Sequence, residues 1–132
     1  MSRVIFGDTS GFYALAAEEN ERHEAATACL TSSMWLITSR FVIMETISLI
    51  TKRMTPLDAR LWYDRFIRSR TVSVREYDPS IYSEAERLWK RRQDKTWDLI
   101  DCYSFCLMQR EGISEAMTFD SHFRQAGFKI IG

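Results

Sequence analysis

The sequence predicts an α/β fold in which one parallel sheet is covered by helices on both faces. Two observations predict it: short apolar runs typical of strands alternate with longer segments of helical periodicity, and the first three runs are each followed by two helical segments. Strands that alternate with helices favour a parallel sheet, because each connection must cross back over it. A length of 132 residues and a hydrophobic content of 45% suit one core. We therefore expect residues 1–132 to form a single domain.

Five segments are predicted to be strands because they are short, apolar and rich in β-branched or aromatic residues. In chain order they are Arg3–Gly7, Trp35–Ser39, Thr71–Tyr77, Glu115–Phe119 and Phe128–Ile131. The segments between them carry apolar residues at three- and four-residue spacing, which indicates amphipathic helices. These are Gly11–Glu18, Glu21–Ser32, Phe41–Met54, Pro56–Ser69, Ser80–Arg92, Leu99–Glu111 and a short helix from Ser121. Pro56 suits a first helical turn, and Gly112 suits a helix end.

Five carboxylates stand in or beside these apolar segments. Asp8 ends the first strand, Glu45 interrupts an apolar helix, and Asp120 follows the fourth strand. Asp98 and Asp101 open a helix that is apolar nearly all round. An ionised carboxylate is costly to bury unless it is paired or binds a metal. On the apolar faces that carry Asp8, Glu45 and Asp120, no Lys or Arg lies nearby in the sequence. A divalent cation with oxygen ligands is the natural counter-charge.

Each acid taken alone also has a structural interpretation. Asp8, Asp98 and Asp120 stand at predicted helix starts, where Asp is a favoured N-cap. Glu45 could lie on an exposed flank, and Asp101 could be a first-turn acid that the helix dipole favours. Their joint placement favours a common site, because ligands of open α/β sheets bind outside the carboxyl ends of the strands. Oxygen ligands from separate segments at that edge are what Mg²⁺ or Mn²⁺ chemistry on phosphodiesters requires.

Several segments resemble the PIN-domain ribonucleases, which include the VapC toxins of prokaryotic toxin–antitoxin pairs. The segments are Asp8-Thr9-Ser10, Glu45 in the third helix, Trp97–Phe105, and Thr118–Phe128. The resemblance implies a three-layer PIN-like domain with a central parallel sheet of order 3-2-1-4-5. It implies a metal-dependent endoribonuclease of single-stranded RNA that is held by an antitoxin protein and forms a homodimer. The catalytic and metal-binding residues that it implies are Asp8, Glu45, Asp101 and Asp120, with Mg²⁺ or Mn²⁺ as cofactor.

Asp98 departs from the family pattern, in which Ser or Thr commonly opens this helix. Asp98 could therefore act only as a cap, or it could add a fifth charge to the metal site. Thr9, Ser10 and Thr118 flank the acids and could hold water or phosphate, or serve only as capping hydroxyls. Ser104 lies one turn beyond Asp101 and could orient it, or satisfy the helix backbone. His122 is interpreted as a surface or capping residue, with a substrate contact as the alternative.

The basic stretch before Asp98 is a candidate RNA-binding rim. The residues predicted to contact RNA are Arg91, Arg92, Lys95 and Arg40, and Lys52 and Arg53 could extend the rim. The alternative for the basic stretch is a solvated helix end that the dipole favours. Trp62 and Phe66 could belong to the core or to a surface where a partner helix docks.

Two other function classes remain open at this stage. One is a catalytically inactive PIN fold that only binds RNA or protein. The other is an aspartyl-phosphate-type phosphatase, which wants a second aspartate two residues after the first, whereas Asp8 is followed by Thr9 and Ser10. No apolar stretch is long enough for a membrane span, and the three cysteines suit a reducing compartment. We therefore expect a cytoplasmic protein without a membrane partner.

Overall fold

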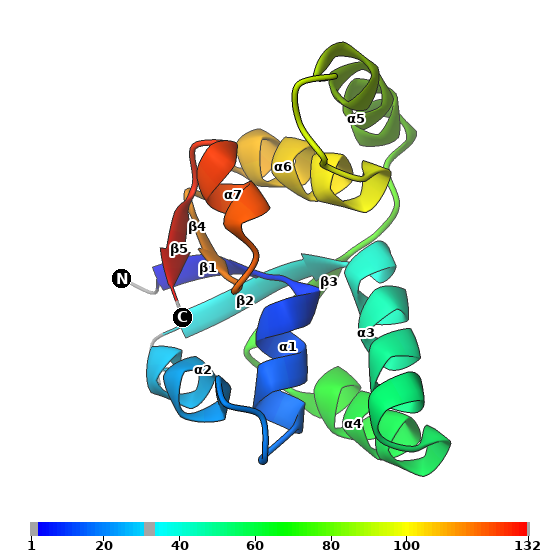
Figure 1. Cartoon of the computed structure of the whole chain (residues 1–132), viewed down its shortest axis with the longest axis vertical. Coiled ribbons are helices and arrows are strands. Elements are labelled where there is room, and N and C mark those ends of the chain that lie inside the picture. The colour runs from blue at the N-terminus through cyan, green and yellow to red at the C-terminus, as the bar shows by residue number, and fades with distance from the viewer. Residues whose placement is uncertain (1–2, 31–33, 132) are drawn as a thin grey trace.

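The five predicted strands form one parallel sheet. The structure is a computed structural model that describes residues 3–30 and 34–131 (Figure 1). Its strand order is β3-β2-β1-β4-β5, and every neighbouring pair is parallel. The strands are β1 Arg3–Gly7, β2 Met34–Ser39, β3 Val72–Arg75, β4 Glu115–Met117 and β5 Lys129–Ile131. The predicted order 3-2-1-4-5 is confirmed, with β1 at the centre.

Helices cover both faces of the sheet and make three layers. They are α1 Thr9–Ala16, α2 His23–Cys29, α3 Arg40–Arg53, α4 Pro56–Arg68, α5 Pro79–Arg91, α6 Leu99–Glu111 and α7 Ser121–Gln125. Figure 1 shows α1 to α4 on one side of the sheet and α5 to α7 on the other. The two-helix connections after β1, β2 and β3 are as predicted. Among the described residues, no helix is both long and apolar enough to cross a membrane.

Side-chain hydroxyls explain where the fourth strand stops. It was expected to reach Phe119, but β4 ends at Met117. The backbone N–H of Phe119 donates to Ser10 Oγ at 2.8 Å, and that of Asp120 donates to Thr118 Oγ1 at 3.0 Å. These amides are therefore taken by side chains and do not continue the ladder.

Other bounds differ by a few residues. β3 is shorter than the predicted 71–77, and β5 begins one residue after the predicted 128. The helix predicted over Glu21–Ser32 begins at His23 and ends at Cys29, and its predicted last residues, 31 and 32, lie outside the described part of the chain. Gly112 ends α6 with a φ of 69°, in the left-handed region that favours glycine, as expected of a C-terminal stop.

The core brings the carboxyl ends of β1 and β4 close to α1. Phe6 of β1 and Phe105 of α6 both pack against Phe123 of α7. The ring centroid of Phe123 lies 6.1 Å from that of Phe6 and 5.0 Å from that of Phe105. On the other face, a Cβ added to Gly11 of α1 would lie 2.4 Å from the carbonyl oxygen of Met117. Only glycine permits this approach, which holds the start of α1 against the end of β4.

Candidate functional site

Four predicted acids reach one pocket from four separate segments. Asp8 follows β1, Glu45 lies in α3, Asp101 lies in the first turn of α6, and Asp120 is the N-cap of α7. The pocket has a volume of about 310 Å³. Its lining residues are Asp8, Thr9, Ser10, Tyr13, Asn20, Arg22, Glu45, Leu49, Arg53, Asp98, Asp101 and Asp120. The carboxylates therefore meet at the carboxyl edge of the sheet, as the sequence predicted.

Asp8 is the most deeply buried of these acids. It is 6% exposed, and it accepts a hydrogen bond of 2.9 Å from Thr118 Oγ1. The pKa of Asp8 is raised to about 7, chiefly by burial and in smaller part by the charges of Asp101 and Glu45, while the Thr118 hydrogen bond acts in the opposite direction. A neighbouring cation would favour the ionised form, because these acids repel one another when no counter-charge is present.

Three hydroxyls hold the carboxylates in place. Thr9 Oγ1 donates to Glu45 Oε1 at 2.5 Å. Ser10 Oγ lies 3.0 Å from Thr118 Oγ1, and the single hydroxyl hydrogen of Thr118 goes to Asp8. Ser10 must therefore donate to Thr118, which gives a directed chain of hydrogen bonds from Ser10 to Asp8. Thr9 and Thr118 contact the acids directly, and Ser10 reaches Asp8 through Thr118, so these hydroxyls do more than cap backbone groups.

Asp98 and Asp101 form a reciprocal cap at the start of α6. The Asp101 N–H donates to Asp98 Oδ1 at 2.8 Å, and the Asp98 N–H donates to Asp101 Oδ2 at 3.2 Å. Asp98 therefore acts as a cap, one of its two expected roles, and its exposed side chain also lines the pocket. Burial, and then the charge of Asp98, raise the pKa of Asp101 to about 6.

His122 joins the acids of α6 and α7. Its Nδ1 atom lies 2.9 Å from Asp101 Oδ2 and 3.4 Å from Asp120 Oδ1. Its backbone N–H donates to Asp120 Oδ1 at 2.9 Å. Ligand atoms of Asp101, Asp120 and His122 lie within 4.8 Å of one another. Sequence reasoning gave His122 a surface, capping or substrate role, whereas its ring in fact contacts the acidic cluster.

Ser104 was expected either to orient Asp101 or to bond to the helix backbone, and its side chain does neither. It is buried on α6, and its Oγ has no hydrogen-bond partner among the residues that the structure describes. It therefore neither bonds to Asp101 nor satisfies the helix backbone, and both expectations are wrong. Helical spacing alone placed it one turn from Asp101, but it did not determine where the hydroxyl would lie.

The cations at the pocket differ from most of those predicted. None of Arg91, Arg92, Lys95 and Arg40 lines it. Arg92 pairs with Asp94 at 3.0 Å, and Arg40 pairs with Glu76 at 3.0 Å.

In their place, Arg22 and Arg53 line the pocket. Arg53 was expected only as an extension of the basic rim, and Arg22 was missed altogether. Arg22 precedes α2 in sequence, so only the fold of the α1–α2 connection brings it to the acids.

The aromatic residues of α4 face inward. Phe66 is 8% exposed and packs edge-on against Phe12 at 5.2 Å, and half-buried Trp62 stacks on Phe66 at 4.8 Å. Phe66 therefore belongs to the core, which is one of the two roles expected of it, and not to a surface where a partner docks.

The donor set of the pocket fits a divalent metal. Asp8, Glu45, Asp101 and Asp120 offer carboxylate oxygens, which are the ligands that Mg²⁺ and Mn²⁺ prefer. Burial first, and then the neighbouring carboxylates, raise the pKa of Asp8 and of Asp101, so a bound cation would favour the ionised form of both. Within the described residues, the ion pairs of the chain leave Asp8 and Glu45 without a Lys or Arg partner.

Two proteins of known structure share the fold at low identity. FitAcB from Neisseria gonorrhoeae has a TM-score of 0.66 at 17% identity, covering 97% of this chain and 96% of that one. VapBC2 from Rickettsia felis, solved with a DNA fragment from its promoter, has a TM-score of 0.66 at 11% identity, covering 96% of each chain. At such identities, the likeness concerns the fold alone.

A Mycobacterium tuberculosis protein is more similar in both sequence and structure. The chain is 29% identical over 126 residues to the 23S rRNA-specific endonuclease VapC20, covering 95% of each protein. The crystal structure of VapC20, described as a sarcin–ricin loop cleaving toxin, matches with a TM-score of 0.85 at 30% identity over 94% of this chain and 95% of that one. Residues 5–129 match the PIN domain family model. The chain therefore belongs to the PIN domain family.

Proposed function

We propose that this protein is a divalent-metal-dependent endoribonuclease and the toxin of a toxin–antitoxin pair. The observation that carries the proposal is the meeting of Asp8, Glu45, Asp101 and Asp120 in one pocket. The similarity to VapC20 across nearly the whole chain supports it, because that relative is an endonuclease. A catalytically inactive PIN fold would have no need for a buried, repelling carboxylate such as Asp8, which destabilises the metal-free protein.

The residues of the pocket divide the work of phosphodiester hydrolysis. A bound Mg²⁺ or Mn²⁺ would supply an activated water and would stabilise negative charge on the scissile phosphate. Asp8, Glu45, Asp101 and Asp120 would hold the ion. Thr9 fixes the direction of the Glu45 carboxylate, and the chain from Ser10 through Thr118 fixes that of Asp8. Such fixed ligands need little rearrangement during the reaction.

The proposed substrate is ribosomal RNA, and its single-stranded or loop phosphodiesters are the proposed cleavage points. VapC20 is named for cleavage of 23S rRNA and of its sarcin–ricin loop, and it shares 29% identity with this chain. Because ribosomes lie in the cytoplasm, the proposed site of action is the cytoplasm. Arg91, Arg92, Lys95 and Arg40 remain proposed RNA contacts outside the pocket, where they could follow the backbone of a large RNA.

An antitoxin protein is the proposed partner of the acidic pocket. A partner arginine could pair with the carboxylates and take the place of the metal, since guanidinium and carboxylate groups form strong bidentate hydrogen bonds. Such a contact would remove the ion on which the proposed activity depends.

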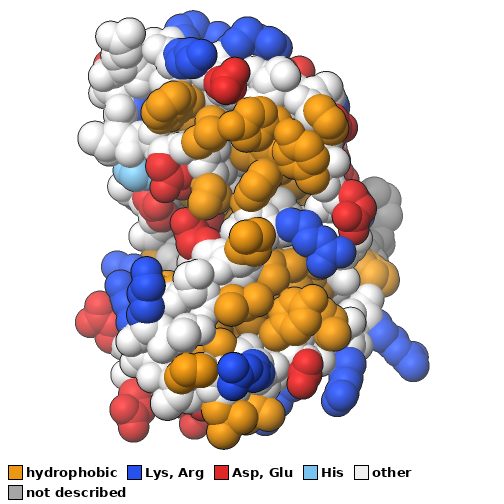
Figure 2. Space-filling model, turned by 90° about the vertical axis from the view of Figure 1, so that its right-hand side faces the viewer, with side chains coloured by type: hydrophobic (Ala, Val, Ile, Leu, Met, Phe, Trp, Pro, Cys, Tyr) orange, Lys and Arg blue, Asp and Glu red, His pale blue; other side chains and the backbone are white. Residues whose placement is uncertain are grey.

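A homodimer is proposed through the side formed by α3, α4 and α5. Figure 2 shows that hydrophobic side chains gather on this side of the molecule. Exposed apolar residues on these elements and beside them are Met44, Leu57, Leu61, Ile67, Tyr77 and Trp89. An exposed apolar surface of this kind is typical of an interface, and a second copy presents the same surface in return.

Cleavage of RNA by the purified protein tests the proposed activity. A sarcin–ricin loop hairpin and total ribosomal RNA should be cut with Mg²⁺ or Mn²⁺ and remain intact in EDTA. The Asp101→Asn variant should not cut either RNA. Expression of the wild-type protein should arrest growth of a bacterial host, and expression of Asp101→Asn should not. Intact RNA in the presence of every divalent metal would favour the inactive-module alternative.

A further inference from the structure

A second hollow continues the acidic pocket. Its volume is about 620 Å³, within the usual range of small-ligand sites. The hollow is lined by Tyr13, Ala16, Ala17, Glu18, Glu19, Asn20, Arg53 and Met54. Three of these, Tyr13, Asn20 and Arg53, also line the acidic pocket, so they form the passage between the two spaces. A polymer held at the carboxylates can therefore extend past Arg53 into this hollow.

Arg53 is positioned to bind an anion in this passage. Its guanidinium carbon lies 5.2 Å from the centre of the Tyr13 ring, a cation–π contact that orders the side chain and leaves its charge uncancelled. In the part of the chain that the structure describes, Arg53 makes no ion pair with a carboxylate. This differs from Arg92 and Arg40, which both have acidic partners. Planar guanidinium groups of this kind suit phosphate oxygens.

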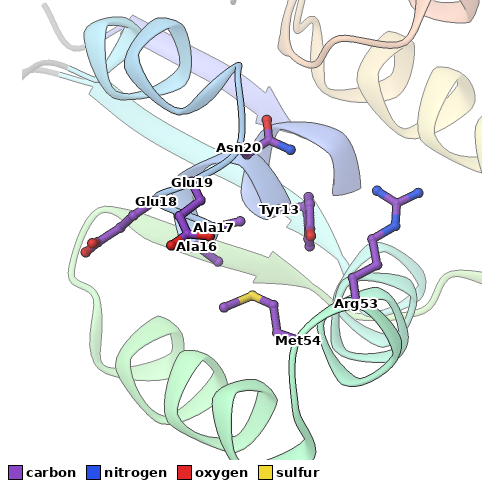
Figure 3. A pocket seen from close by; sticks show the side chains of 8 residues that line it. All are labelled: Tyr13, Ala16, Ala17, Glu18, Glu19, Asn20, Arg53 and Met54. Atoms are coloured by element: carbon purple, nitrogen blue, oxygen red, sulfur yellow. The ribbon is translucent and has the colours of Figure 1, made fainter.

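The two ends of the hollow differ in charge. Figure 3 shows Arg53, Tyr13 and Asn20 toward one end, and Glu18 and Glu19 toward the other. A phosphate would be repelled at the end with the two carboxylates. An uncharged nucleobase would not be repelled there, because its exocyclic amino group can donate a hydrogen bond to a carboxylate or to the Asn20 amide oxygen. The hollow therefore suits a base whose phosphate stays at the arginine.

We propose that Arg53, Tyr13 and the second hollow form a nucleotide subsite beside the cleavage centre. Arg53 binds the RNA phosphate next to the scissile one, and the hollow receives the base of the same nucleotide. The subsite rests on the proposed ribonuclease function and adds the direction in which the strand leaves the acids. Arg22, held over the Phe119 ring at 5.1 Å, lies at the acidic pocket but does not line the hollow.

Binding of a labelled RNA tests this subsite separately from cleavage. The probe is a fluorescent single-stranded RNA of mixed sequence, measured by anisotropy with Ca²⁺ in place of Mg²⁺ and checked on a gel to be intact. Arg53→Gln should weaken binding by roughly tenfold, as expected for a charge-assisted hydrogen bond. It should also reduce the slope of log affinity against log salt by about 0.7, the value for one lost phosphate contact. Arg53→Lys should keep the salt slope.

Arg68→Gln is the matched control, because Arg68 is an exposed arginine at the end of α4, carries the same charge and lines neither space. It should bind RNA like the wild type. Unchanged affinity and salt slope in a folded Arg53→Gln variant would overturn the subsite, and so would an equal loss in Arg68→Gln. If Arg53→Gln lost only the capture of a co-expressed inhibitor protein, the hollow would be a protein-binding surface and the subsite would be wrong. Wild-type cleavage of RNA with Mg²⁺ would uphold the proposed function in each of these cases, whereas a wild-type protein that neither binds nor cuts RNA would overturn both proposals.

Discussion

His122 Nδ1 lies 2.9 Å from Asp101 Oδ2, and the same oxygen accepts the backbone N–H of Asp98 at 3.2 Å. One oxygen of Asp101 is therefore occupied by the ring and the helix cap, which leaves Oδ1 for a metal ion. An ionised carboxylate can accept hydrogen bonds but cannot donate them. Nδ1 of His122 therefore carries the proton in this contact. His122 thus fixes the orientation of a proposed ligand, in the manner of the outer groups of other metal sites.

Removing the His122 ring should weaken metal binding. We expect His122→Phe to raise the Mn²⁺ dissociation constant roughly tenfold or more, as loss of an outer hydrogen bond does at other sites. Calorimetric titration measures the constant without any RNA. His122→Asn should retain part of the affinity, because its amide can still donate to Asp101. An affinity unchanged in both variants would show that the contact is not needed for the site.

Mg²⁺ or Mn²⁺ should raise the melting temperature of the wild-type protein. An ion that binds only the folded state stabilises it by mass action, and it also relieves repulsion among the carboxylates. The Asp8→Asn/Asp101→Asn double variant should lose this rise. Asp64→Asn, at an exposed position on α4 outside the pocket, is the control and should retain it. A rise of equal size in the double variant would contradict the shared metal site.

Without metal, the protein should become less stable as pH rises. The pKa of Asp8 is about 7 in the folded protein against 3.8 for an unperturbed Asp, so the folded state binds more protons between these values. The free energy of unfolding should therefore fall with rising pH in that window, by at most about 1.4 kcal/mol per pH unit from this group. Urea unfolding in EDTA at a series of pH values measures this free energy. Asp8→Asn should flatten the dependence, and a wild-type stability that rises over the window would argue against a buried, protonated Asp8.

Each of the four acids should be required for cleavage. Asp8→Ala, Glu45→Ala, Asp101→Ala and Asp120→Ala should each lower the rate by about a hundredfold or more, since a metal-held water and charge stabilisation account for much of such a reaction. Single-turnover cleavage of the hairpin measures the rate. Asp98→Ser should be milder, because Ser can still cap α6. Near-normal cleavage by Glu45→Ala would remove Glu45 from the proposed ligands.

The outer basic residues should contribute to RNA affinity but not to metal binding. We expect Arg91→Ala and Arg92→Ala each to lower the salt slope of RNA binding by about 0.7 and to leave the Mn²⁺ dissociation constant unchanged. The loss of RNA affinity should be smaller for Arg92→Ala than for Arg91→Ala, because Arg92 is already paired with Asp94. Unchanged RNA affinity at low salt in both variants would mark the end of α5 as an ordinary solvated helix terminus.

Local patterns in the sequence predicted the strands, the helices and the candidate carboxylates, whereas the strand order 3-2-1-4-5 was predicted by the resemblance to PIN-domain ribonucleases. Asp8, Asp98 and Asp120 mark boundaries between apolar strands or loops and helices, and such boundaries can be recognised from spacing alone. Arg22 and Arg53 could not be assigned in the same way. Their place at the acidic pocket depends on the path of the α1–α2 connection and on the end of α3. The roles expected of Ser104 were wrong because a helical pattern does not specify which neighbours a side chain meets, and for the same reason the sequence left Phe66 open between the core and a partner surface.

The carboxyl edge of the sheet is completed only after β4 has been made. β1, which leads into Asp8, is the central strand, but its neighbour on one side is β4, and β4 and Asp120 follow all of the other acids of the pocket in chain order. A nascent chain that has emerged only as far as α6 carries Asp8, Glu45 and Asp101 without the strand that joins them to Asp120. The order of translation thus delays assembly of the centre until β4 and the start of α7 have been made.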